Sequence, residues 1–404
     1  MPEIQTSVER WGRYAIRVWR EALTYRAYVP PRLETLSMGL SLGLAQLLAE
    51  AERSLRDLQA GRRGRTGNTQ TRHFGQDFEA LAHQLLRSES VASSGMEGSR
   101  VSHRGLARAL YDPAVATRTT RAVVGNVRAM ERAIQLGTSR GDFSLDDLRT
   151  IHGVLVESAD EPSVPGDVRS SQTWIGGTDV WPHDADYIPP PPDEVLGLLL
   201  DLCAFINRTD VPGLLQAAIA HAQFEAIHPF LVGNGRVGRC LVQVVLRRRG
   251  LIPRFLPPVS VVLGNNVTAY VEGLRDYRAG RVEDWCGLFA RSASIVADRA
   301  TDLATRIEDV KAAWYERAAR PRRDSAAARL LSVLALRPVV DVAATQRLLG
   351  VSDEAARLAL IGLERRGVLK RVGPARYRRA WLAEDVFVLL DEFDDSMGSV
   401  LSGF

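Results

Sequence analysis

The sequence predicts a mainly α-helical protein with a small β-hairpin flap and a C-terminal winged helix-turn-helix module. Three observations support this fold class. Apolar residues recur at spacings of three and four over most of the chain, a Gly-, Pro- and aromatic-rich stretch at residues 162–192 interrupts them, and residues 324–380 contain an order of helices and strands of their own. We divide the chain into an N-terminal helical region at 1–103, a core at 104–319 and the module at 320–404.

Helical spacing begins early in the chain. Residues 1–60 are predicted to be helical, with an interruption at residues 28–31 and one long helix over residues 33–58. A further helix over about residues 74–93 ends near Gly95 and Gly98. In the core, the 162–192 stretch is expected to form a loop with a short hairpin. The predicted core helices are three within 104–156, of which the last is capped by Ser144, then 193–206, 211–227 and 236–249, and two or three within 267–316.

The module has a separate pattern. Its predicted elements are helices at 325–336, 341–349 and 353–366, followed by short strands at 367–372 and 375–381. Gly350 is expected to stop the second helix and Ser352 to cap the third. Helix, helix, turn, helix and hairpin is the order of a winged helix-turn-helix.

Charge is distributed unevenly along the chain. The net charge is +4, but residues 320–380 contain fourteen Arg and Lys against five Asp and Glu, so the rest of the chain is mildly acidic. A basic block on such a body suggests an anionic partner. A solvated, Arg-rich surface explains the same block equally well.

Composition excludes several classes of protein. No apolar run is long enough to cross a bilayer, and the first residues lack the basic and apolar regions of a signal peptide. Cys203, Cys240 and Cys286 stand far apart, so we expect reduced core cysteines rather than a disulfide frame or a zinc site. These features predict a cytoplasmic protein with no membrane contact.

The polar pattern with the clearest chemistry is the segment His-Pro-Phe-Leu-Val-Gly-Asn-Gly-Arg-Val-Gly-Arg at residues 228–239. Pro229 cannot continue the preceding helix, so that helix is expected to end at about His228. The two glycines of Gly-Asn-Gly, Gly233 and Gly235, permit positive φ and allow backbone N–H groups to form an anion-binding nest. This loop is therefore predicted to bind phosphate.

Two arginines and a histidine complete the pattern. Arg236 is expected to open the next helix, where the helix N-terminus favours anions, and Arg239 shares its face three residues later. Both guanidinium groups can bind phosphate oxygens through two hydrogen bonds. His228 at the mouth of the loop is placed to take a proton from an attacking hydroxyl. A Rossmann fingerprint is rejected because the glycines follow a helix rather than a strand, and no Gly-Lys-Ser/Thr of a Walker A loop is present.

The segment resembles the signature of the Fic family, His-x-Phe-x-Asp/Glu-Gly-Asn-Gly-Arg-x-x-Arg. Residues 222–227 before it fit as well, and residues 165–169 and 174–177 resemble the family's flap, a β-hairpin that holds a target segment by strand addition. The resemblance covers roughly residues 30–320. It implies a Fic-type helical bundle and a protein adenylyltransferase that moves AMP from ATP to a hydroxyl of a target protein held at about residues 165–188.

The resemblance also implies roles for single residues. His228 is the expected general base, Arg239 the expected ligand of the γ-phosphate, and Tyr270 an adenine-side aromatic. The expected ligands of the other nucleotide phosphates are Gly233, Asn234, Gly235 and Arg236.

One position departs from the family. Val232 stands where the family has the Asp or Glu that coordinates Mg²⁺, and valine offers a hard cation no ligand. Three readings stay open: Mg²⁺ held by ATP and water alone with low activity, a carboxylate supplied by Asp184 or Asp186, or a nucleotide binder with little catalysis. The third reading leads to an alternative function: a nucleotide-binding, DNA-binding transcription regulator with a catalytically impaired Fic domain, in which the C-terminal module binds the DNA.

A second family motif lies upstream. Ser93-Ser94-Gly95-Met96-Glu97-Gly98 resembles the inhibitory motif Ser/Thr-x-x-x-Glu-Gly/Asn, in which Ser93 and Glu97 are the motif residues. The resemblance implies that the Glu97 carboxylate pairs with Arg239 and keeps it from the γ-phosphate. Removal of AMP from a modified target is a further activity that this motif implies.

The module supplies the second hypothesis. Its third helix and wing are rich in basic residues that can contact phosphates of duplex DNA over residues 324–380. They are Arg357, Arg365, Arg366, Lys370, Arg371, Arg376, Arg378 and Arg379. A module for protein contact is the alternative, and the sequence leaves open whether the chain forms a homodimer.

Overall fold

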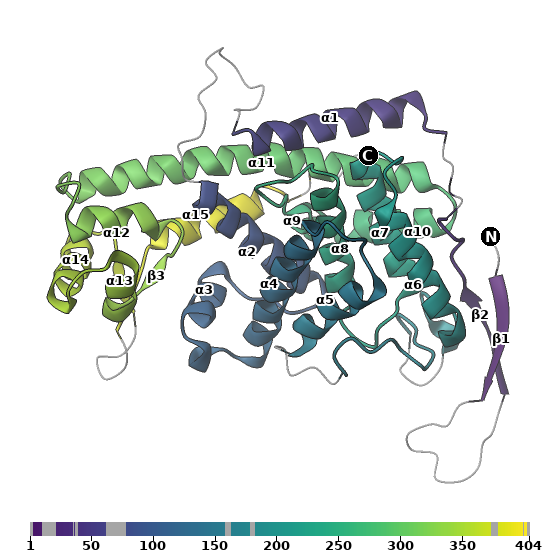
Figure 1. Ribbon diagram of the computed structural model, residues 1–404. Coiled ribbons are helices and arrows are strands. Elements are labelled where there is room, and N and C mark those ends of the chain that lie inside the picture. Colours follow the sequence, from purple (N-terminus) through teal and green to yellow (C-terminus); the bar gives the residue numbers. More distant parts are fainter. Residues whose placement is uncertain are drawn as a thin grey trace, which may run out of the picture. The chain divides into compact units, whose positions relative to one another are not determined.

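The structure is a computed structural model of the chain (Figure 1). It describes residues 3–9, 22–34, 36, 39–61, 78–157, 163–177, 182–372, 379–398 and 400–401. Helices dominate these residues and strands are few, which confirms the predicted mainly α fold class. Within the same residues, no helix is both long and apolar enough to span a membrane.

The helices and strands have the following bounds. The helices are α1 (Leu42–Gln59), α2 (Phe78–Met96), α3 (His103–Tyr111), α4 (Arg118–Gly137), α5 (Leu145–Glu157), α6 (Pro192–Asn207), α7 (Gly213–Ile227), α8 (Asn234–Arg248), α9 (Val259–Asn265), α10 (Val267–Arg278), α11 (Val282–Arg317), α12 (Ala326–Leu334), α13 (Val342–Leu349), α14 (Asp353–Arg365) and α15 (Glu384–Asp395), with 3₁₀ turns η1 (Pro113–Val115) and η2 (Pro182–Asp184). Strands β1 (Glu3–Glu9) and β2 (Ala22–Tyr28) pair antiparallel. Strands β3 (Val339–Val340), β4 (Lys370–Val372) and β5 (Ala380–Leu382) form an antiparallel sheet in the order β3-β5-β4.

Packing divides the chain into two compact units built from interleaved segments. Unit 1 contains Met1–Leu48, Arg128–Gly250 and Tyr270–Ala290, and unit 2 contains Ala49–Val127, Leu251–Ala269 and Arg291–Phe404. Unit 1 therefore holds α7, α8 and the flap, whereas unit 2 holds α2, α9 and the module. The three predicted domains follow different boundaries and stay a prediction.

Helix α7 is the core of unit 1 and is buried on nearly every face. Its sequence is apolar all round apart from a few residues such as His221, which is typical of a buried helix. Helix α8 approaches it closely at Gly238, where an added Cβ would lie 2.7 Å from Glu225 Oε1 and 3.0 Å from Phe224 Cδ1. Glycine at this position therefore fixes the spacing of the two helices that flank the candidate site.

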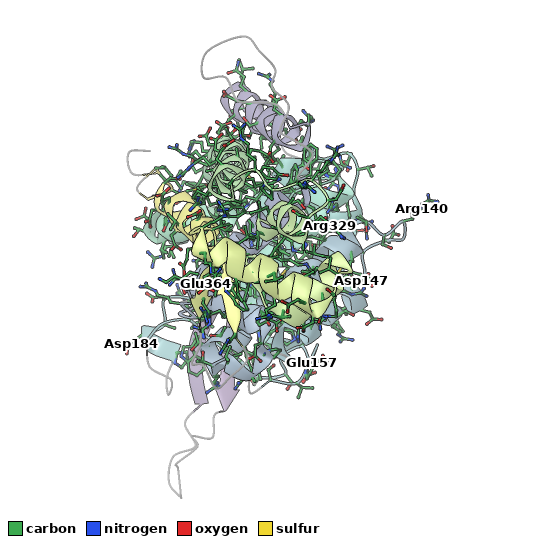
Figure 2. All side chains as sticks on the ribbon, turned by 90° about the vertical axis from the view of Figure 1, so that its left-hand side faces the viewer. Arg140, Asp147, Glu157, Asp184, Arg329 and Glu364 are labelled. Atoms are coloured by element: carbon green, nitrogen blue, oxygen red, sulfur yellow. The ribbon has the colours of Figure 1, made fainter. Side chains whose placement is uncertain are left out.

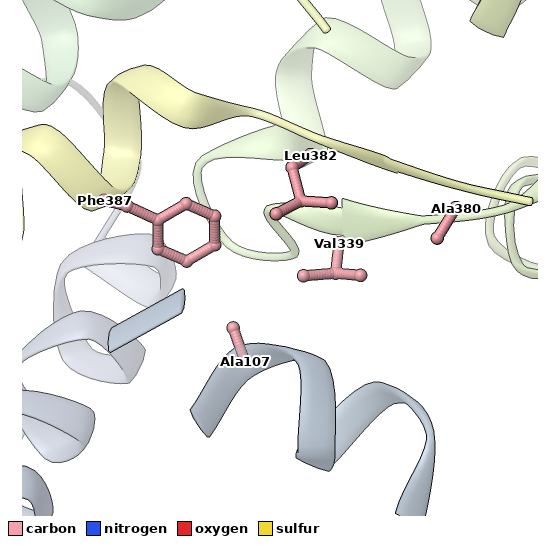
Figure 3. Close-up of a cluster of buried hydrophobic side chains, with 5 residues drawn as sticks. All are labelled: Ala107, Val339, Ala380, Leu382 and Phe387. Atoms are coloured by element: carbon pink, nitrogen blue, oxygen red, sulfur yellow. The ribbon is translucent and has the colours of Figure 1, made fainter. Parts of the chain in front are cut away.

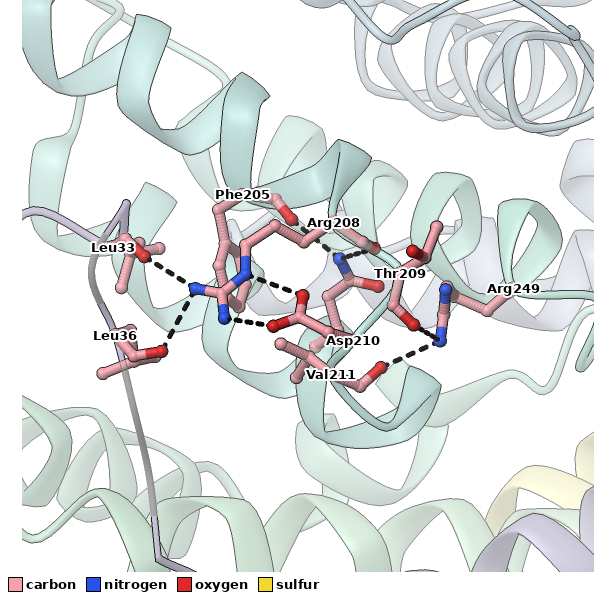
Figure 4. Close-up of polar contacts among 9 residues, drawn as sticks. Leu33, Leu36, Phe205, Arg208, Thr209, Asp210, Val211 and Arg249 are labelled. Carbon is pink, nitrogen blue, oxygen red and sulfur yellow. Dashed lines mark hydrogen bonds and ion pairs between the residues drawn. The ribbon is translucent and has the colours of Figure 1, made fainter.

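Within residues 33–41 the described ones are not helical, although residues 33–58 are predicted to form one helix. Asp201 on α6 accepts a hydrogen bond from the N–H of Leu33 at 2.7 Å. Arg208 donates one to the carbonyl oxygen of Leu33 at 3.2 Å, as Figure 4 shows. A helix would need these main-chain groups for its own ladder. Helix α1 begins only after Ser41, whose Oγ accepts a first-turn N–H at 3.3 Å, so the prediction is wrong at its N-terminal end.

The prediction that the first 28 residues are helical is also wrong over the described ones, residues 3–9 and 22–28. They contain the hairpin of β1 and β2, in which Glu3 lies opposite Tyr28 and Glu9 opposite Ala22. The sequence of β1, Glu-Ile-Gln-Thr-Ser-Val-Glu, alternates apolar or β-branched residues with polar ones at period two. Residues 3–9 therefore follow the two-residue period of a strand and not the helical period that was predicted.

In unit 2 the module shares a hydrophobic cluster with α3 (Figure 3). The buried members are Ala107 of α3, Val339 of β3, Ala380 and Leu382 of β5, and Phe387 of α15. Gln84 of α2 adds a hydrogen bond of 2.6 Å from its Nε2 to the carbonyl oxygen of Ala335, at the end of α12. The module is thus packed against α3 and bonded to α2, the helix that carries Ser93.

The module contains its predicted helices and strands in the predicted order. Ser325, Asp341 and Ser352 cap α12, α13 and α14 through their side chains, and Gly350 with φ 62° ends α13. Two further elements, β3 and α15, were not predicted. Residues 373–378, which include Arg376 and Arg378, lie outside the described residues.

Candidate active site

The candidate site is the connection between α7 and α8. Helix α7 ends at Ile227, as predicted, and His228 follows it in the left-handed region with φ 48°, with its N–H donating to the carbonyl oxygen of Phe224 at 2.9 Å. Pro229 prevents the helix from continuing. The chain turns again at Gly233, which has φ 80° and is the N-cap of α8. His228 therefore lies one short loop away from a helix N-terminus.

Arg169 holds the end of α7 in place. Its Nε donates to the carbonyl oxygen of His228 at 2.8 Å, and its Nη2 donates to those of Pro190 at 2.5 Å and Ile227 at 3.4 Å. Its own N–H donates to the carbonyl oxygen of Pro229 at 2.9 Å. Burial lowers the pKa of Arg169 to about 10. A cation at a helix C-terminus is favourable, so Arg169 stabilises the left-handed turn at His228.

Sequence reasoning assigned Arg169 no role, because nothing local separates it from a solvated loop arginine. We expect Arg169→Met to lower the free energy of unfolding by about 3 kcal/mol, since it leaves several buried carbonyl groups without a donor. Part of that loss is offset because a buried guanidinium is itself costly. Arg169→Lys is the matched control, since it keeps the charge without the planar fork. Urea unfolding curves of the three proteins measure the difference; equal midpoints for Met and wild type would contradict the assignment.

Asn234 closes the loop on itself. Its Oδ1 accepts from the N–H of Phe230 at 2.9 Å, and its Nδ2 donates to the carbonyl oxygen of the same residue at 2.8 Å. Helix α8 starts at Asn234, two residues before the predicted start at Arg236. Of the two glycines predicted to permit positive φ, Gly233 adopts it, whereas Gly235 lies in the first helical turn. The groups that could bind an anion there are the first-turn N–H groups of α8.

Gly233 is required on two grounds. Its φ of 80° is unfavourable for other residues, and a Cβ added to it would lie 2.8 Å from Leu155 Cδ2. We expect Gly233→Ala to cost about 2 kcal/mol of folding free energy, and the second change Leu155→Ala to relieve the collision but not the backbone strain. Thermal unfolding of both single variants and the double variant measures the coupling. Strict additivity of the two changes would show that this collision does not occur.

Arg236 and Arg239 are both buried, with 5% and 3% of their surface exposed. They lie in the first two turns of α8, so their charges add to the positive potential of the helix N-terminus. The structure thus brings His228, Gly233, Asn234 and Arg236 into one loop and helix start. Nucleotide binding by these residues stays a prediction.

Tyr270 is packed in the core of unit 1. It is 7% exposed, its Oη lies 3.0 Å from Nε2 of His221, and its ring centroid lies 6.1 Å from that of Trp285. Burial, and after it the charge of Arg239, lowers the pKa of His221 to about 3, so this histidine is neutral at physiological pH. Tyr270 therefore has a packing role, and its contact with adenine stays a prediction.

The predicted flap contains one antiparallel bridge, between Ile175 and Tyr187. Next to it, Gly176 has φ 76°, and a Cβ there would lie 2.1 Å from Asp186 Oδ2, so the two arms approach as only glycine allows. Tyr187 also donates its hydroxyl to the carbonyl oxygen of Ala226 at 2.5 Å. The flap is therefore bonded to the last turn of α7.

The candidate ligands for Mg²⁺ do not come together among the described residues. Val232 has no oxygen in its side chain, and its carbonyl oxygen lies 3.3 Å from Nε2 of His152. Asp184, labelled in Figure 2, and Asp186 are both exposed on the flap. The described part of the chain holds no group of three or more His, Cys, Asp or Glu side chains suited to a metal.

The model of the Fic/DOC family matches residues 142–246. These residues form a Fic/DOC domain. It includes α5, the flap, α6, α7 and most of α8, and therefore His228, Arg236 and Arg239. Tyr270, Ser93 and Glu97 lie outside the matched range.

Relatives of the Fic/DOC domain are named protein adenylyltransferases. Protein adenylyltransferase fic-1 of Caenorhabditis elegans is 30% identical over 125 residues, which cover 30% of this chain and 23% of that protein. Protein adenylyltransferase Fic of Drosophila melanogaster is 29% identical over 119 residues, 29% of this chain and 22% of that protein. A Fic family protein from Desulfovibrio desulfuricans has the same fold, with a TM-score of 0.51 and 18% identity over 86% of this chain and 97% of its own. The chain thus aligns with less than a quarter of the two named enzymes.

The motif predicted to be inhibitory lies in unit 2, outside the Fic/DOC domain. Ser93 is fully buried near the end of α2, and Glu97 is an exposed residue in the turn after it, where its N–H donates to the carbonyl oxygen of Ser94 at 3.1 Å. The carboxylate thus stands at the C-terminal end of a helix, as predicted. Arg239 belongs to unit 1, and a pairing between Glu97 and Arg239 stays a prediction.

Acidic neighbours occupy part of the module's basic surface. Arg357 forms an ion pair of 2.7 Å with Glu354, and Arg371 one of 2.8 Å with Glu364. Both glutamates lie on α14, the helix expected to enter DNA. Arg365, Arg366, Lys370 and Arg379 are exposed. DNA binding by this module stays a prediction, as does a contact with protein.

Proposed function

We propose that this chain transfers the adenylyl group of ATP to a hydroxyl side chain of a target protein. One observation carries the proposal most strongly: a single loop places His228, in a left-handed turn held by Arg169, next to the N-terminus of α8 with its two buried arginines. A base beside a fixed positive site is what transfer of an anionic group to a hydroxyl needs. The names of the relatives support the same reaction.

In the proposed step the target hydroxyl loses its proton to the imidazole of His228. The oxygen forms a bond with the α-phosphorus of ATP while the bond from that phosphorus to the β-bridging oxygen breaks, and pyrophosphate leaves. First-turn N–H groups of α8, Arg236 and Arg239 stabilise the negative charge on the phosphates. The products are an AMP ester of the target, pyrophosphate, and the proton on His228. No step is assigned to a protein-bound metal, because Val232 offers no ligand.

Regulation is part of the proposal. Glu97 is proposed to pair with Arg239 and so to keep the γ-phosphate from its place. A carboxylate near the phosphate site also repels ATP through its charge. The pairing would make the resting protein a weak transferase. A Glu97→Gly variant is therefore tested beside the wild type.

Two labelled forms of ATP test the reaction. Purified full-length protein and its Glu97→Gly variant are incubated with a cell lysate and with ATP labelled at the α- or the γ-phosphate. The proposal expects α-label on protein bands, and no γ-label beyond that of lysate incubated without the protein. Additional γ-label would indicate a kinase. If neither form adds label, the proposed transfer fails, and the module at residues 320–404 is the next place to look for function.

A further inference from the structure

His152 joins three segments of unit 1, and neither the sequence pattern nor the proposed mechanism uses it. It lies on α5 and is fully buried. Its Nδ1 accepts a hydrogen bond from the N–H of Gly166, at the start of the flap, at 3.0 Å. Its Nε2 lies 3.3 Å from the carbonyl oxygen of Val232, in the loop before α8.

The ring of His152 also stacks on Phe230 in the same loop. The two centroids are 3.8 Å apart and the planes differ by 1°. Phe230 is fully buried and its main chain is closed by Asn234. The stack therefore positions the part of the loop between His228 and Gly233. The two ring nitrogens, which are bonded to Gly166 and Val232, hold the ring itself in place.

The hydrogen bonds define the tautomer. A backbone N–H can only donate, so Nδ1 carries no proton, and Nε2 carries the one that it donates to Val232. Burial is the main cause that lowers the pKa of His152 to about 4; Arg236 lowers it further, whereas the bond to Val232 and the charge of Asp167 raise it. The neutral ring with both nitrogens bonded is thus the form present at physiological pH.

The flap starts close to α5 around His152. Gly166 has φ 74°, and a Cβ there would lie 3.1 Å from the carbonyl oxygen of Arg149, while a Cβ on Gly153 would lie 3.6 Å from Pro165 Cβ. Three residues after Gly166, Arg169 bonds the carbonyl groups at the end of α7. A contact path therefore runs from the loop before α8 through His152 to the flap and back to His228.

We infer that His152 is a positioning residue that sets the distance between the flap, where the target is proposed to lie, and the loop that carries His228 and Gly233. The inference rests on the proposed transfer for its purpose, but not for its test. His152 is not assigned a catalytic role, because it is fully buried and both of its ring nitrogens are bonded to main-chain groups. Its effect on transfer is exerted through Gly166 and Val232.

Three variants separate the two contacts. In His152→Asn the amide oxygen takes the position of Nδ1 and keeps the bond to Gly166, but the side chain is too short for Val232. In His152→Gln the longer side chain can reach Val232 with its Nε2 and gives up Gly166. His152→Phe keeps a ring that can stack on Phe230 and loses both bonds.

Amide hydrogen exchange of the full chain reads the result without any transfer. His152→Asn and His152→Gln both remove the ring that stacks on Phe230, so we expect faster exchange at residues 229–237 in both. At residues 163–171 we expect about fivefold to tenfold faster exchange in His152→Gln and His152→Phe but not in His152→Asn, which is the effect of losing the hydrogen bond to Gly166. Residues 193–206 of α6 are the control. Unchanged exchange in both segments, equal exchange at residues 163–171 in Asn and Gln, or equal acceleration in α6 would each overturn the inference.

Kinetics then separate positioning from general packing. With labelled ATP, both variants should raise KM for ATP, because both loosen the loop, and His152→Gln should in addition lower kcat, because only it releases Gly166. Equal kcat values in the two variants contradict the inference. If wild type transfers no label, the proposed function fails while the exchange result still decides the role of His152.

Discussion

Replacing His228 should abolish adenylyl transfer and leave ATP binding nearly unchanged. A positioned general base contributes about 10² to 10⁴ in rate, so we expect label incorporation to fall at least about 100-fold. The contacts proposed for the phosphates come from α8 and its arginines, which the change does not touch. Incorporation of α-labelled AMP and equilibrium binding of ATP, measured on the same preparations, check both halves of the prediction.

The backbone at His228 decides which variant to use. His228 has φ 48°, and alanine in the left-handed region costs about 1 kcal/mol, whereas asparagine tolerates it. His228→Asn therefore removes the base with less risk to the turn than His228→Ala. Arg239→Ala is the complementary control, because it should weaken ATP binding while the base remains. Wild-type incorporation by His228→Asn would mean that another group accepts the proton.

Local signals predicted the elements that carry the site. Pro229 after an apolar run predicted the end of α7, and the glycines predicted a turn before α8, because both residues act through their own φ and need no distant partner. Ser352 and Gly350 bounded α14 and α13 for the same reason. Gly235 misled because glycine permits positive φ but does not require it.

Contacts between distant residues were not predictable in the same way. Arg169 bonds the carbonyl group of His228, 59 residues away in the sequence. The N–H of Gly166 bonds His152, 14 residues earlier, in another element. Asp201 bonds Leu33 across 168 residues and so cancels the helical tendency of that segment. Such roles depend on the assembled fold, since no local spacing distinguishes these side chains from solvated ones.

The module shows a further limit of reading domains from sequence. Its helices were predicted, but β3 and α15, which pack it against α3, were not. His103 of α3 lies 2.8 Å from Asp394 of α15, and Arg104 pairs with Glu384 of the same helix. Deleting residues 321–404 would strip these partners and expose Ala107. Point variants such as Arg365→Ala are therefore better tests of DNA binding than truncation.

The proposed pairing of Glu97 with Arg239 and the missing carboxylate at Val232 should behave as coupled defects. Glu97 is proposed to hold Arg239, which displaces the γ-phosphate, whereas Val232 deprives Mg²⁺ of the carboxylate that the family supplies. Glu97→Gly alone should therefore raise ATP affinity more than turnover. Val232→Asp alone should change little, because the phosphates are still misplaced. The side chain of Val232 is partly exposed and only its carbonyl oxygen is bonded to His152, so the new carboxylate need not disturb that contact.

The double variant should gain much more than the two single variants together. We expect a coupling free energy of at least about 1 kcal/mol, as for sites that act on one bound ligand. Label incorporation by wild type, both single variants and the double variant at one Mg²⁺ concentration closes the cycle. Val232→Asn is the matched control, because it adds a polar group of the same size with a weaker ligand for a hard cation. If Glu97→Gly alone reaches the activity of the double variant, Val232 is not a lesion of the metal site, and the charge on the phosphates is neutralised by ATP-bound Mg²⁺ together with Arg236 and Arg239.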